Sequence, residues 1–369
     1  MNINRKTLKR FDFILVFVVL ALSIYGIIMI SSATSSGSFL SNSYVKTQAI
    51  AFLLGFAAVF ILIFIDYEIY GNLYIFIYTV SNLLLIAVLL FGFGEDQWGA
   101  RSWLSIGPIT FQPSEIAKIG IIISLAKFID KNENTLNHPL TLIKILGFAG
   151  LPILLILLQP DFGTAMVMVF FISIMLFVSG LSLKYIFSVV ILGAVSLPIV
   201  YSNLEEFQLN RIKVFFNPLL DPQDAGYQVL QSKIAIGSGK LFGRGLFEGV
   251  QNRYGFLPAK ETDFIFAVIG EELGLIGGLV LIFLYAILLY RMIKLSKNAL
   301  DTFGSLMVIG FTGMILFHIF ENIGMTIGLT PVTGIPLPFI SYGGTFMLVN
   351  MICIGLSLNV GLKKEGLEF

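Results

Sequence analysis

Long apolar stretches separated by short polar segments occupy almost the whole chain. About 20 consecutive apolar helical residues cross a bilayer, so each nearly charge-free stretch predicts one membrane helix. We predict about ten such helices, at residues 13–30, 49–65, 73–91, 111–128, 145–158, 164–180, 185–200, 264–290, 305–324 and 346–360. The pattern therefore predicts an all-α polytopic membrane protein that forms a single membrane domain over residues 1–369.

Composition agrees with this class and argues against several others. The chain is 57% hydrophobic and 12% charged, which is about half the charged fraction of a soluble protein. A net charge of +1 gives no reason to expect nucleic-acid binding. The single cysteine, Cys353, excludes a disulfide framework, and the two histidines, His138 and His318, lie far apart in sequence, which argues against a zinc site.

The distribution of lysine and arginine predicts how the helices are oriented. Short cytoplasmic loops carry more of these residues than short external loops. With the N-terminus inside, the short external loops hold Lys46 and Arg101, and the internal segments hold many more. We therefore expect both termini in the cytoplasm and one large extracellular loop, about 201–262, between the seventh and eighth helices. Two segments of this loop, FQLNRIKVFF and GYQVLQSKIAIGSG, predict short amphipathic helices at the membrane surface.

Asp263 stands where this loop meets the eighth predicted helix, in the stretch FLPAKETDFIFAVIGEELG. A carboxylate at the mouth of an apolar segment costs free energy unless a partner or a substrate uses it. Capping of the helix start is the alternative explanation. Other charged residues close by in the same stretch, Lys260, Glu261 and the pair Glu271–Glu272, favour a functional role for Asp263.

Ionisable residues in or beside other predicted helices give further candidates. Glu115 and Lys118 are three residues apart, so they share a helix face and can form an ion pair, either structural or facing a cavity. Asp161, in QPDFGTA, is either a helix cap or a carboxylate of the site. Arg101, in GARSW, is either an interfacial anchor or a ligand of an anionic substrate.

Two glycine-rich segments also allow two interpretations each. The segment GSGKLFGRG, residues 237–245, lacks the spacing of a nucleotide-binding P-loop. It is either a flexible turn or a strip whose amides, with Lys240 and Arg244, approach a phosphate-bearing lipid. Irregular backbone at membrane depth must be buried in protein or line a cavity. The segment TGIPLPFISYGGT is therefore either a packing loop or a wall beside Asp263.

The predicted orientation places the candidate charges on the external side of the membrane. Such a set suits an anionic, lipid-borne substrate, with one carboxylate as a base and cations that hold a phosphate. These physical arguments leave open whether the protein moves such a lipid or reacts it. The acids are Glu115, Asp161 and Asp263, and the bases include Arg101, Lys118, Arg211, Lys240 and Arg244.

Several long motifs occur in an order that resembles one family over essentially the whole chain. They are GARSWLSIG, FQPSEIAK, QPDFGTA, NRI, GYQVLQSKIAIGSG, FLPAKETDFIFAVIGEELG and TGIPLPFISYGGT. The chain resembles the SEDS (shape, elongation, division and sporulation) proteins, the RodA/FtsW family of bacteria, and is more similar to RodA than to FtsW. It departs from the family pattern at Ala259, Lys260 and Glu261, where an acid and a His or Gln are frequent.

The resemblance implies a peptidoglycan glycosyltransferase of the bacterial plasma membrane. It would polymerise lipid II into glycan strands at the outer face, by inverting transfer, together with a class B penicillin-binding protein in cell elongation and shape. The family's essential aspartate matches Asp263, as general base. Its ion pair matches Glu115 and Lys118, and two further site residues match Asp161 and Arg101. A divalent cation, Mg²⁺ or Mn²⁺, could neutralise the pyrophosphate.

Two other functions fit the same physical features. A lipid II flippase would also use about ten helices, intramembrane charges and a broken helix. A non-catalytic scaffold for the penicillin-binding protein would need no catalytic Asp263. The transpeptidase partner's membrane helix is expected at the small residues of the eighth and ninth helices, such as Gly278 and Gly310, although these suit packing among the chain's own helices at least as well.

Overall fold

A computed structural model describes residues 11–34, 42–94, 101–107, 109–185, 187–188, 191, 195, 202 and 206–363. Nine of the ten predicted membrane helices coincide with a helix in this part of the chain. These are α2 (Phe13–Ala33), α3 (Ser43–Phe64), α5 (Tyr74–Phe91), α7 (Pro113–Lys131), α8 (Pro139–Leu157), α9 (Phe162–Val178), α14 (Ile265–Lys297), α15 (Thr302–Ile327) and α16 (Gly344–Leu362). The remaining helix, predicted at 185–200, falls mostly outside the described residues.

Seven helices in the described residues are long and apolar enough to cross a membrane. The two that fall short of these criteria differ in their reasons: α9 has 17 residues, and α7 carries several charged side chains. The helical class is thereby confirmed, while the count of ten and the orientation of the termini stay predictions. Large apolar side chains on the outer helices are exposed, as a bilayer requires, among them Phe60, Phe76 and Phe283.

The interior of the bundle is built around α15 and α16. α15 packs against α7, α9 and α14, and α16 packs against α3. Their buried faces are apolar, with Phe311, Met314 and Ile354 each at most 1% exposed. The chain's own helices cover these side chains. The ninth predicted helix, α15, therefore lies inside the bundle and not on its outer surface.

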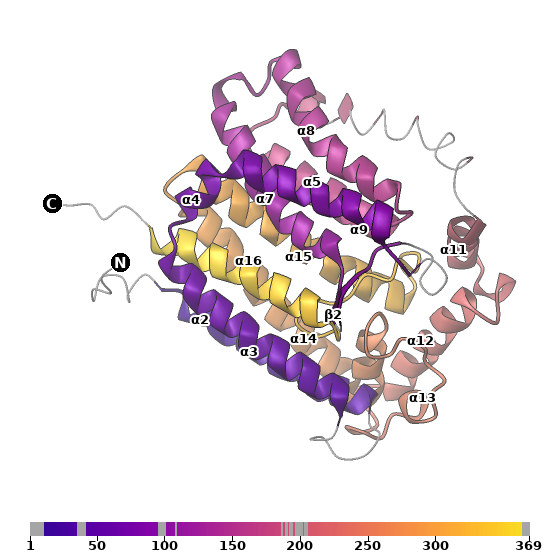
Figure 1. The fold of residues 1–369 in the computed structure, drawn as a ribbon. Helices are drawn as coiled ribbons and strands as arrows, with labels where there is room; N and C mark the ends of the chain where they lie inside the picture. Colours follow the sequence, from indigo (N-terminus) through magenta and orange to yellow (C-terminus); the bar gives the residue numbers. More distant parts are fainter. Residues whose placement is uncertain are drawn as a thin grey trace.

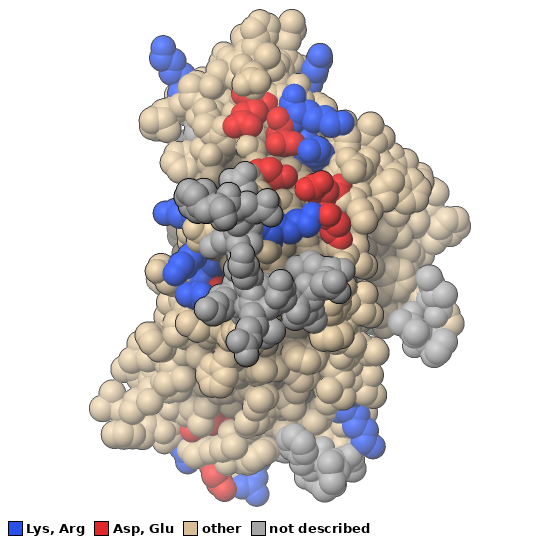
Figure 2. All heavy atoms as spheres, turned by 90° about the vertical axis from the view of Figure 1, so that its left-hand side faces the viewer, with Lys and Arg blue, Asp and Glu red and all other residues tan. Residues whose placement is uncertain are grey.

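The two ends of the bundle differ in character (Figure 1). At one end lie the helices of the predicted large loop and a β-hairpin. The opposite end, where α2 begins and α16 finishes, also holds the short α4, and Figure 2 shows acidic and basic side chains gathered on it. Ion pairs there join Arg291 to Asp12, at 2.7 Å, and Lys363 to Asp66. The shorter elements are α4 (Tyr67–Asn72), the antiparallel strands β1 (Leu104–Ile106) and β2 (Ile109–Phe111), η2 (Glu133–Thr135), α11 (Glu206–Phe216), η3 (Pro218–Leu220), α12 (Ala225–Gly239) and α13 (Val250–Arg253).

The two amphipathic segments predicted in the loop are helices, α11 and α12. However, α12 packs against α14 and α15, and its buried face includes Val229 and Ala235. The Ser232 hydroxyl donates to the carbonyl of Thr326, at 2.7 Å. A Cβ atom on Gly239 would lie 1.9 Å from the carbonyl oxygen of Gly270, so only glycine allows this approach. α12 is therefore an integral part of the helix bundle.

The eighth predicted helix is bent. The backbone of α14 breaks at Gly274, where φ is 67° and ψ is −163°. Residues 240–245 fill the break and satisfy the backbone groups that the break frees. The amides of Arg244 and Gly245 donate to the carbonyls of Glu271 and Glu272, each at 3.0 Å. The amides of Leu275 and Ile276 donate to the carbonyls of Lys240 and Leu241, at 2.9 and 3.2 Å.

This arrangement shows that three amides of the glycine-rich segment 237–245 are used within the protein, whereas the exposed side chains of Lys240 and Arg244 stay predicted ligands of a lipid phosphate. The Gly243 amide donates to the Gly239 carbonyl, at 2.7 Å, and the next two amides are used at the break in α14. These amides are therefore not available to a phosphate, and the segment is not a free surface turn. Backbone groups without partners are too costly at membrane depth, which explains why the loop inserts here.

Candidate active site

Asp263 lies in a turn immediately before α14 and is half-buried. The turn begins at Ala259, whose φ is +47°, and the amides of Thr262 and Phe264 both donate to the Ala259 carbonyl. The N-cap residue of α14 is Phe264, and no side chain of the described residues caps the helix. Capping therefore does not explain Asp263, and its carboxyl group is left for another role.

Three consecutive backbone carbonyls of this turn are held by the segment before α16 or by α15. The Tyr342 amide donates to the Glu261 carbonyl at 2.8 Å. The Ser341 hydroxyl donates to the Thr262 carbonyl at 2.6 Å. The Asn322 side-chain amide donates to the Asp263 carbonyl at 2.9 Å. The backbone that carries the carboxyl group is thus fixed from a distant part of the chain.

Residues 334–343 form an irregular segment, here called the support loop, that is bound by side chains from several helices. Its carbonyls at Ile335 and Pro336 accept from Asn322 and His318 of α15, at 2.8 and 3.2 Å. Its carbonyls at Pro338 and Ser341 accept from Tyr285 of α14 and Gln48 of α3, at 2.5 and 3.2 Å. These partners confirm the predicted packing loop, since irregular backbone is tolerated where protein groups satisfy it.

The support loop also lies directly beside the catalytic candidate. A Cβ atom on Gly334 would come within 3.5 Å of Oδ2 of Asp263. Phe339 has a φ of +65° and is 1% exposed. Positive φ is rare for an aromatic residue and persists only where the surroundings hold it, as at many functional sites.

Asp161 caps α9 and ties the β-hairpin region to it. Its Oδ1 accepts from the Thr164 amide at 3.0 Å, and its Oδ2 accepts from the Thr164 hydroxyl at 2.8 Å. Ser102 and Gln112 donate to the same Oδ2, at 3.3 and 3.5 Å. The capping interpretation is therefore confirmed. The cap also lies close to the support loop, because a Cβ atom on Gly163 would be 3.3 Å from the Ile335 side chain.

Arg211 connects the two aspartates electrostatically. Burial lowers the pKa of Arg211, and the negative charges of Asp263, Asp224 and Asp161 oppose this shift. Burial raises the pKa of Asp263 to about 6, although the Arg211 guanidinium and the Thr262 hydroxyl lower it and Glu261 raises it further. An Asp with this pKa is ionised at neutral pH and remains basic enough to accept a proton.

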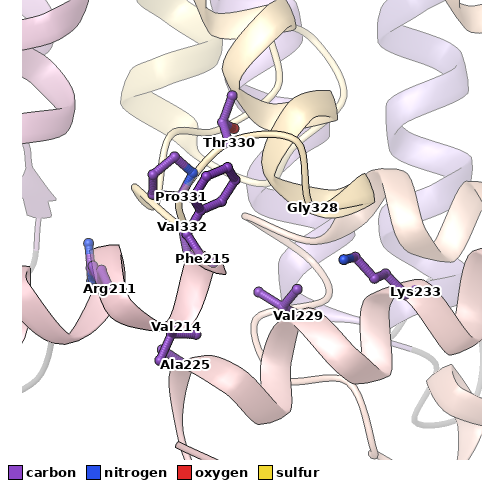
Figure 3. A pocket seen from close by; sticks show the side chains of 10 residues that line it. All are labelled: Arg211, Val214, Phe215, Ala225, Val229, Lys233, Gly328, Thr330, Pro331 and Val332. Atoms are coloured by element: carbon purple, nitrogen blue, oxygen red, sulfur yellow. The ribbon is translucent and has the colours of Figure 1, made fainter. Parts of the chain in front are cut away.

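A small pocket opens between α11, α12 and residues 328–332, with Arg211 on one side (Figure 3). Lys233 lies on the other side, and Val214 and Val229 lie between the two cations. A Cβ atom on Gly328 would lie 2.4 Å from the Lys233 ammonium nitrogen, so the lysine lies against the end of α15. Sequence reasoning did not single out Lys233, because an isolated lysine in an amphipathic segment is ordinarily a solvated residue.

Glu115 and Lys118 form the predicted ion pair, at 2.8 Å, and both are buried, with 3% and 1% exposure. The Lys118 ammonium also lies 3.0 Å from Nε2 of His318. Because lysine can only donate, Nε2 accepts, and Nδ1 of His318 carries the proton that it donates to the Pro336 carbonyl. This burial leaves no surface of the pair for a substrate to touch in this structure. The pair contacts His318 instead, and His318 bonds to the support loop.

The other predicted substrate-binding residues lie in two places. Arg101 is exposed and adjoins Ser102, the donor to Asp161. Lys240 and Arg244 are exposed at the break in α14, and the Arg244 side chain donates to the Ser238 hydroxyl at 3.0 Å. The break is eleven residues beyond Asp263, or roughly 15 Å along a helix. The structure thus gathers Asp161, Arg211 and Asp263, and places Lys240 and Arg244 further away.

The described residues contain no group of three or more His, Cys, Asp or Glu side chains that could hold a metal ion. Both oxygens of Asp161 are already occupied by donors from the protein. The described residues therefore provide no site that could hold a divalent cation by protein side chains alone. Magnesium is commonly bound by one or two carboxylates together with substrate phosphates.

Comparison with known proteins assigns the chain to a family. The family model described as cell cycle protein, which covers FtsW, RodA and SpoVE, matches residues 12–365. The chain belongs to this family. Peptidoglycan glycosyltransferase MrdB of Escherichia coli strain K12 is 37% identical over 100% of this chain and 98% of its own length. Stage V sporulation protein E of Bacillus subtilis strain 168 is 36% identical over 95% of this chain and 96% of its own length.

Solved structures of the FtsW, RodA and SpoVE family have the same fold. One, described as structural coordination of polymerization and crosslinking by a peptidoglycan synthase complex, is 31% identical, covers 95% of this chain and 97% of its own, and gives a TM-score of 0.81. The Thermus thermophilus rod shape determining protein RodA is 29% identical, covers 96% of this chain and 98% of its own, and gives 0.71. The chain is therefore a multi-pass protein of the bacterial plasma membrane and a glycosyltransferase of this family.

Proposed function

We propose that this chain polymerises lipid II into glycan strands at the outer face of the plasma membrane, with Asp263 as the general base. The observation that carries the proposal is the half-buried Asp263 carboxyl group, with a pKa of about 6, on a turn whose carbonyls are held at three consecutive positions. Arg211 supplies positive charge to the same site. A relative named peptidoglycan glycosyltransferase and a solved structure described as a peptidoglycan synthase complex support the substrate class.

The chemistry needs one base and positive charge. The donor sugar carries undecaprenyl pyrophosphate at its anomeric carbon, and this group leaves with the bonding electrons once its charge is neutralised. Asp263 accepts the proton of the acceptor hydroxyl as the new C–O bond forms on the opposite face. An α-linked donor then gives a β-linked product. Glycosidases generally need a second carboxyl group as acid, whereas pyrophosphate leaves without one.

The remaining predicted residues receive roles that follow from their positions. Arg211 and Arg101 would bind the pyrophosphate, and Asp161 would hold the β-hairpin region beside them. Glu115 and Lys118 would act on substrate binding indirectly, through the support loop. Lys240 and Arg244 would approach a lipid phosphate with their side chains, further along the membrane surface. A Mg²⁺ or Mn²⁺ ion would have to be bound mainly by the pyrophosphate oxygens, because the described residues contain no group of three or more side chains that could hold it.

The rate of polymerisation is expected to rise with pH through about 6 and to level off above pH 7. The base must be ionised, and Asp263 has a pKa of about 6, so about a tenth of the protein is active at pH 5. Removing the Glu261 charge should lower the pKa of Asp263 and move this acid limb to lower pH. The measurement is kcat/KM for lipid II between pH 4.5 and 8.5 in the wild type and Glu261→Gln. A flat profile would contradict the assignment of Asp263 as base.

Polymerisation of purified lipid II by the purified chain, with and without its class B penicillin-binding protein, tests the proposed function. Product glycan from the chain alone excludes a scaffold, because a scaffold has no chemistry of its own. Absence of product together with transfer of lipid II across vesicle membranes would favour the flippase. The partner is included because a similar solved structure is described as a peptidoglycan synthase complex.

We place the partner's membrane helix on the outer face of α14. Leu279 and Phe283 are 53% and 65% exposed and lie one helical turn apart. Placement at Gly310 is wrong, because a Cβ atom there would lie 2.5 Å from Ile122 and 2.9 Å from Met175 of the chain's own helices. Cysteines at Leu279 and Phe283 are expected to crosslink to the partner, and a cysteine at Gly310 is not.

Polymerisation assays with and without the partner measure the coupling between the partner and the site. Contact with the partner is expected to increase polymerisation without adding a catalytic residue, by favouring the active arrangement of the external loop. Equal rates with and without the partner would contradict the coupling. Crosslinks from Leu279 and Phe283 that reach only other helices of this chain would contradict the placement.

A further inference from the structure

Asp263 precedes its helix, so no regular hydrogen-bond ladder fixes its backbone. α14 begins at Ile265, and the turn from Ala259 makes only two internal amide bonds to the Ala259 carbonyl. A catalytic group displaced by about 1 Å can lose about 10²-fold in rate. Whatever holds the carbonyls of residues 261–263 therefore affects the reaction through the position of Asp263.

Asn322 is buried with 0% exposure, and both hydrogens of its amide are used on the site. One goes to the Asp263 carbonyl at 2.9 Å, and the other goes to the Ile335 carbonyl at 2.8 Å. Its side-chain oxygen has no hydrogen-bond partner among the described residues. A buried oxygen without a partner costs free energy, so an apolar residue would serve packing better. The two donors therefore account for an asparagine at this position.

Ser341 makes the second link, and it is 1% exposed. Its hydroxyl accepts from the Leu337 amide at 2.8 Å and donates to the Thr262 carbonyl at 2.6 Å. One hydroxyl thus shapes the support loop and holds the residue before Asp263.

The support loop is itself anchored deep in the bundle. His318 holds its Pro336 carbonyl, and the Lys118–Glu115 pair holds His318, through contacts of 3.2, 3.0 and 2.8 Å. Gln48 of α3 brackets the other end, donating to the Ser341 carbonyl at 3.2 Å and accepting from the Gly343 amide at 3.0 Å. A loop held at both ends can transmit a fixed position to the turn that it contacts.

We propose that Asn322 and Ser341 are positioning residues for Asp263, which they hold through the backbone of residues 261–263. The proposal rests on the proposed function, in which Asp263 is the base. Neither side chain would touch the substrate. Loss of either donor would let the turn relax and would lower turnover, while binding of lipid II, which depends on other groups, would change little.

The test compares Asn322→Leu and Ser341→Ala with two matched controls in the same bundle. The controls, Asn350→Leu and Ser357→Ala, remove buried side chains of the same types that donate to carbonyls of their own helix, at 2.8 and 2.7 Å. We expect kcat to fall about 10- to 100-fold in the two site variants, with KM for lipid II within about twofold of wild type. The controls are expected to keep kcat within about threefold.

Each variant is assayed with the partner present, and its thermal inactivation temperature is recorded. Ser341→Ala removes a single oxygen, so the test does not depend on folding of the Asn322 variant. Equal losses of kcat in site and control variants, or losses confined to KM, would overturn the positioning role. If Asp263→Asn is inactive and the site variants match their controls, only this inference fails. If Asp263→Asn is active, the proposed base fails as well.

Discussion

Asp263→Asn is expected to abolish glycan polymerisation while the protein still reaches the membrane and folds. Asparagine has nearly the same shape, and the three hydrogen bonds that hold this turn involve backbone carbonyls, so the substitution leaves them intact. Removal of a general base typically costs 10²- to 10⁴-fold in rate, or more where the base is the main catalytic group. The measurement is the rate of lipid II polymerisation by purified protein with its partner.

Glu261→Gln is the matched control for this substitution. It removes a half-buried acid two residues away, in the same turn, and leaves its carbonyl bond to the Tyr342 amide in place. The control is expected to polymerise at close to the wild-type rate at pH 7.5. Near wild-type polymerisation by Asp263→Asn would show that another group takes the proton.

Hydropathy predicted most of the fold because the bilayer requires uninterrupted apolar helices. The third predicted helix, 73–91, is α5 (Tyr74–Phe91), and the ninth, 305–324, lies within α15 (Thr302–Ile327). The packing of residues 240–245 into the broken α14 could not be predicted. Its hydrogen bonds join main-chain groups about 30 residues apart, and main-chain groups are the same whatever the side chains.

The candidate site was predictable only where it carries charge. Charged residues in apolar surroundings are rare, so Asp263, Asp161 and the Glu115–Lys118 pair were evident from sequence. Ser341 and Asn322 were not, because a serine in an irregular segment and an asparagine in a helix ordinarily bond to backbone groups close to them in sequence. Ser341 lies 79 residues from the carbonyl that it holds. No spacing rule connects positions so far apart, and the contact exists only once α14, α15 and the support loop are assembled.

Glu115→Ala is expected to destabilise the protein more than the removal of both members of its ion pair. The single substitution leaves the Lys118 ammonium buried at 1% exposure, with His318 as its remaining partner among the described residues. Breaking a buried pair in this way costs about 3–5 kcal/mol, whereas replacing both charges by apolar groups is often neutral. Oε2 of Glu115 has no hydrogen-bond partner among the described residues, so the charge of this pair is incompletely compensated. Glu115→Ala combined with Lys118→Met should therefore recover much of the loss.

The same helix supplies an internal control for the buried pair. Lys127 and Asp130 form an ion pair of 2.7 Å with the same three-residue spacing, but their side chains are 23% and 22% exposed. Exposed pairs contribute about 0–1 kcal/mol, so Asp130→Ala should change thermal stability little. The measurement is the thermal inactivation temperature and polymerisation rate of both single variants, the double variant and Asp130→Ala. Additive losses at Glu115 and Lys118 would contradict the coupling, because a broken pair must cost more than a pair that is absent.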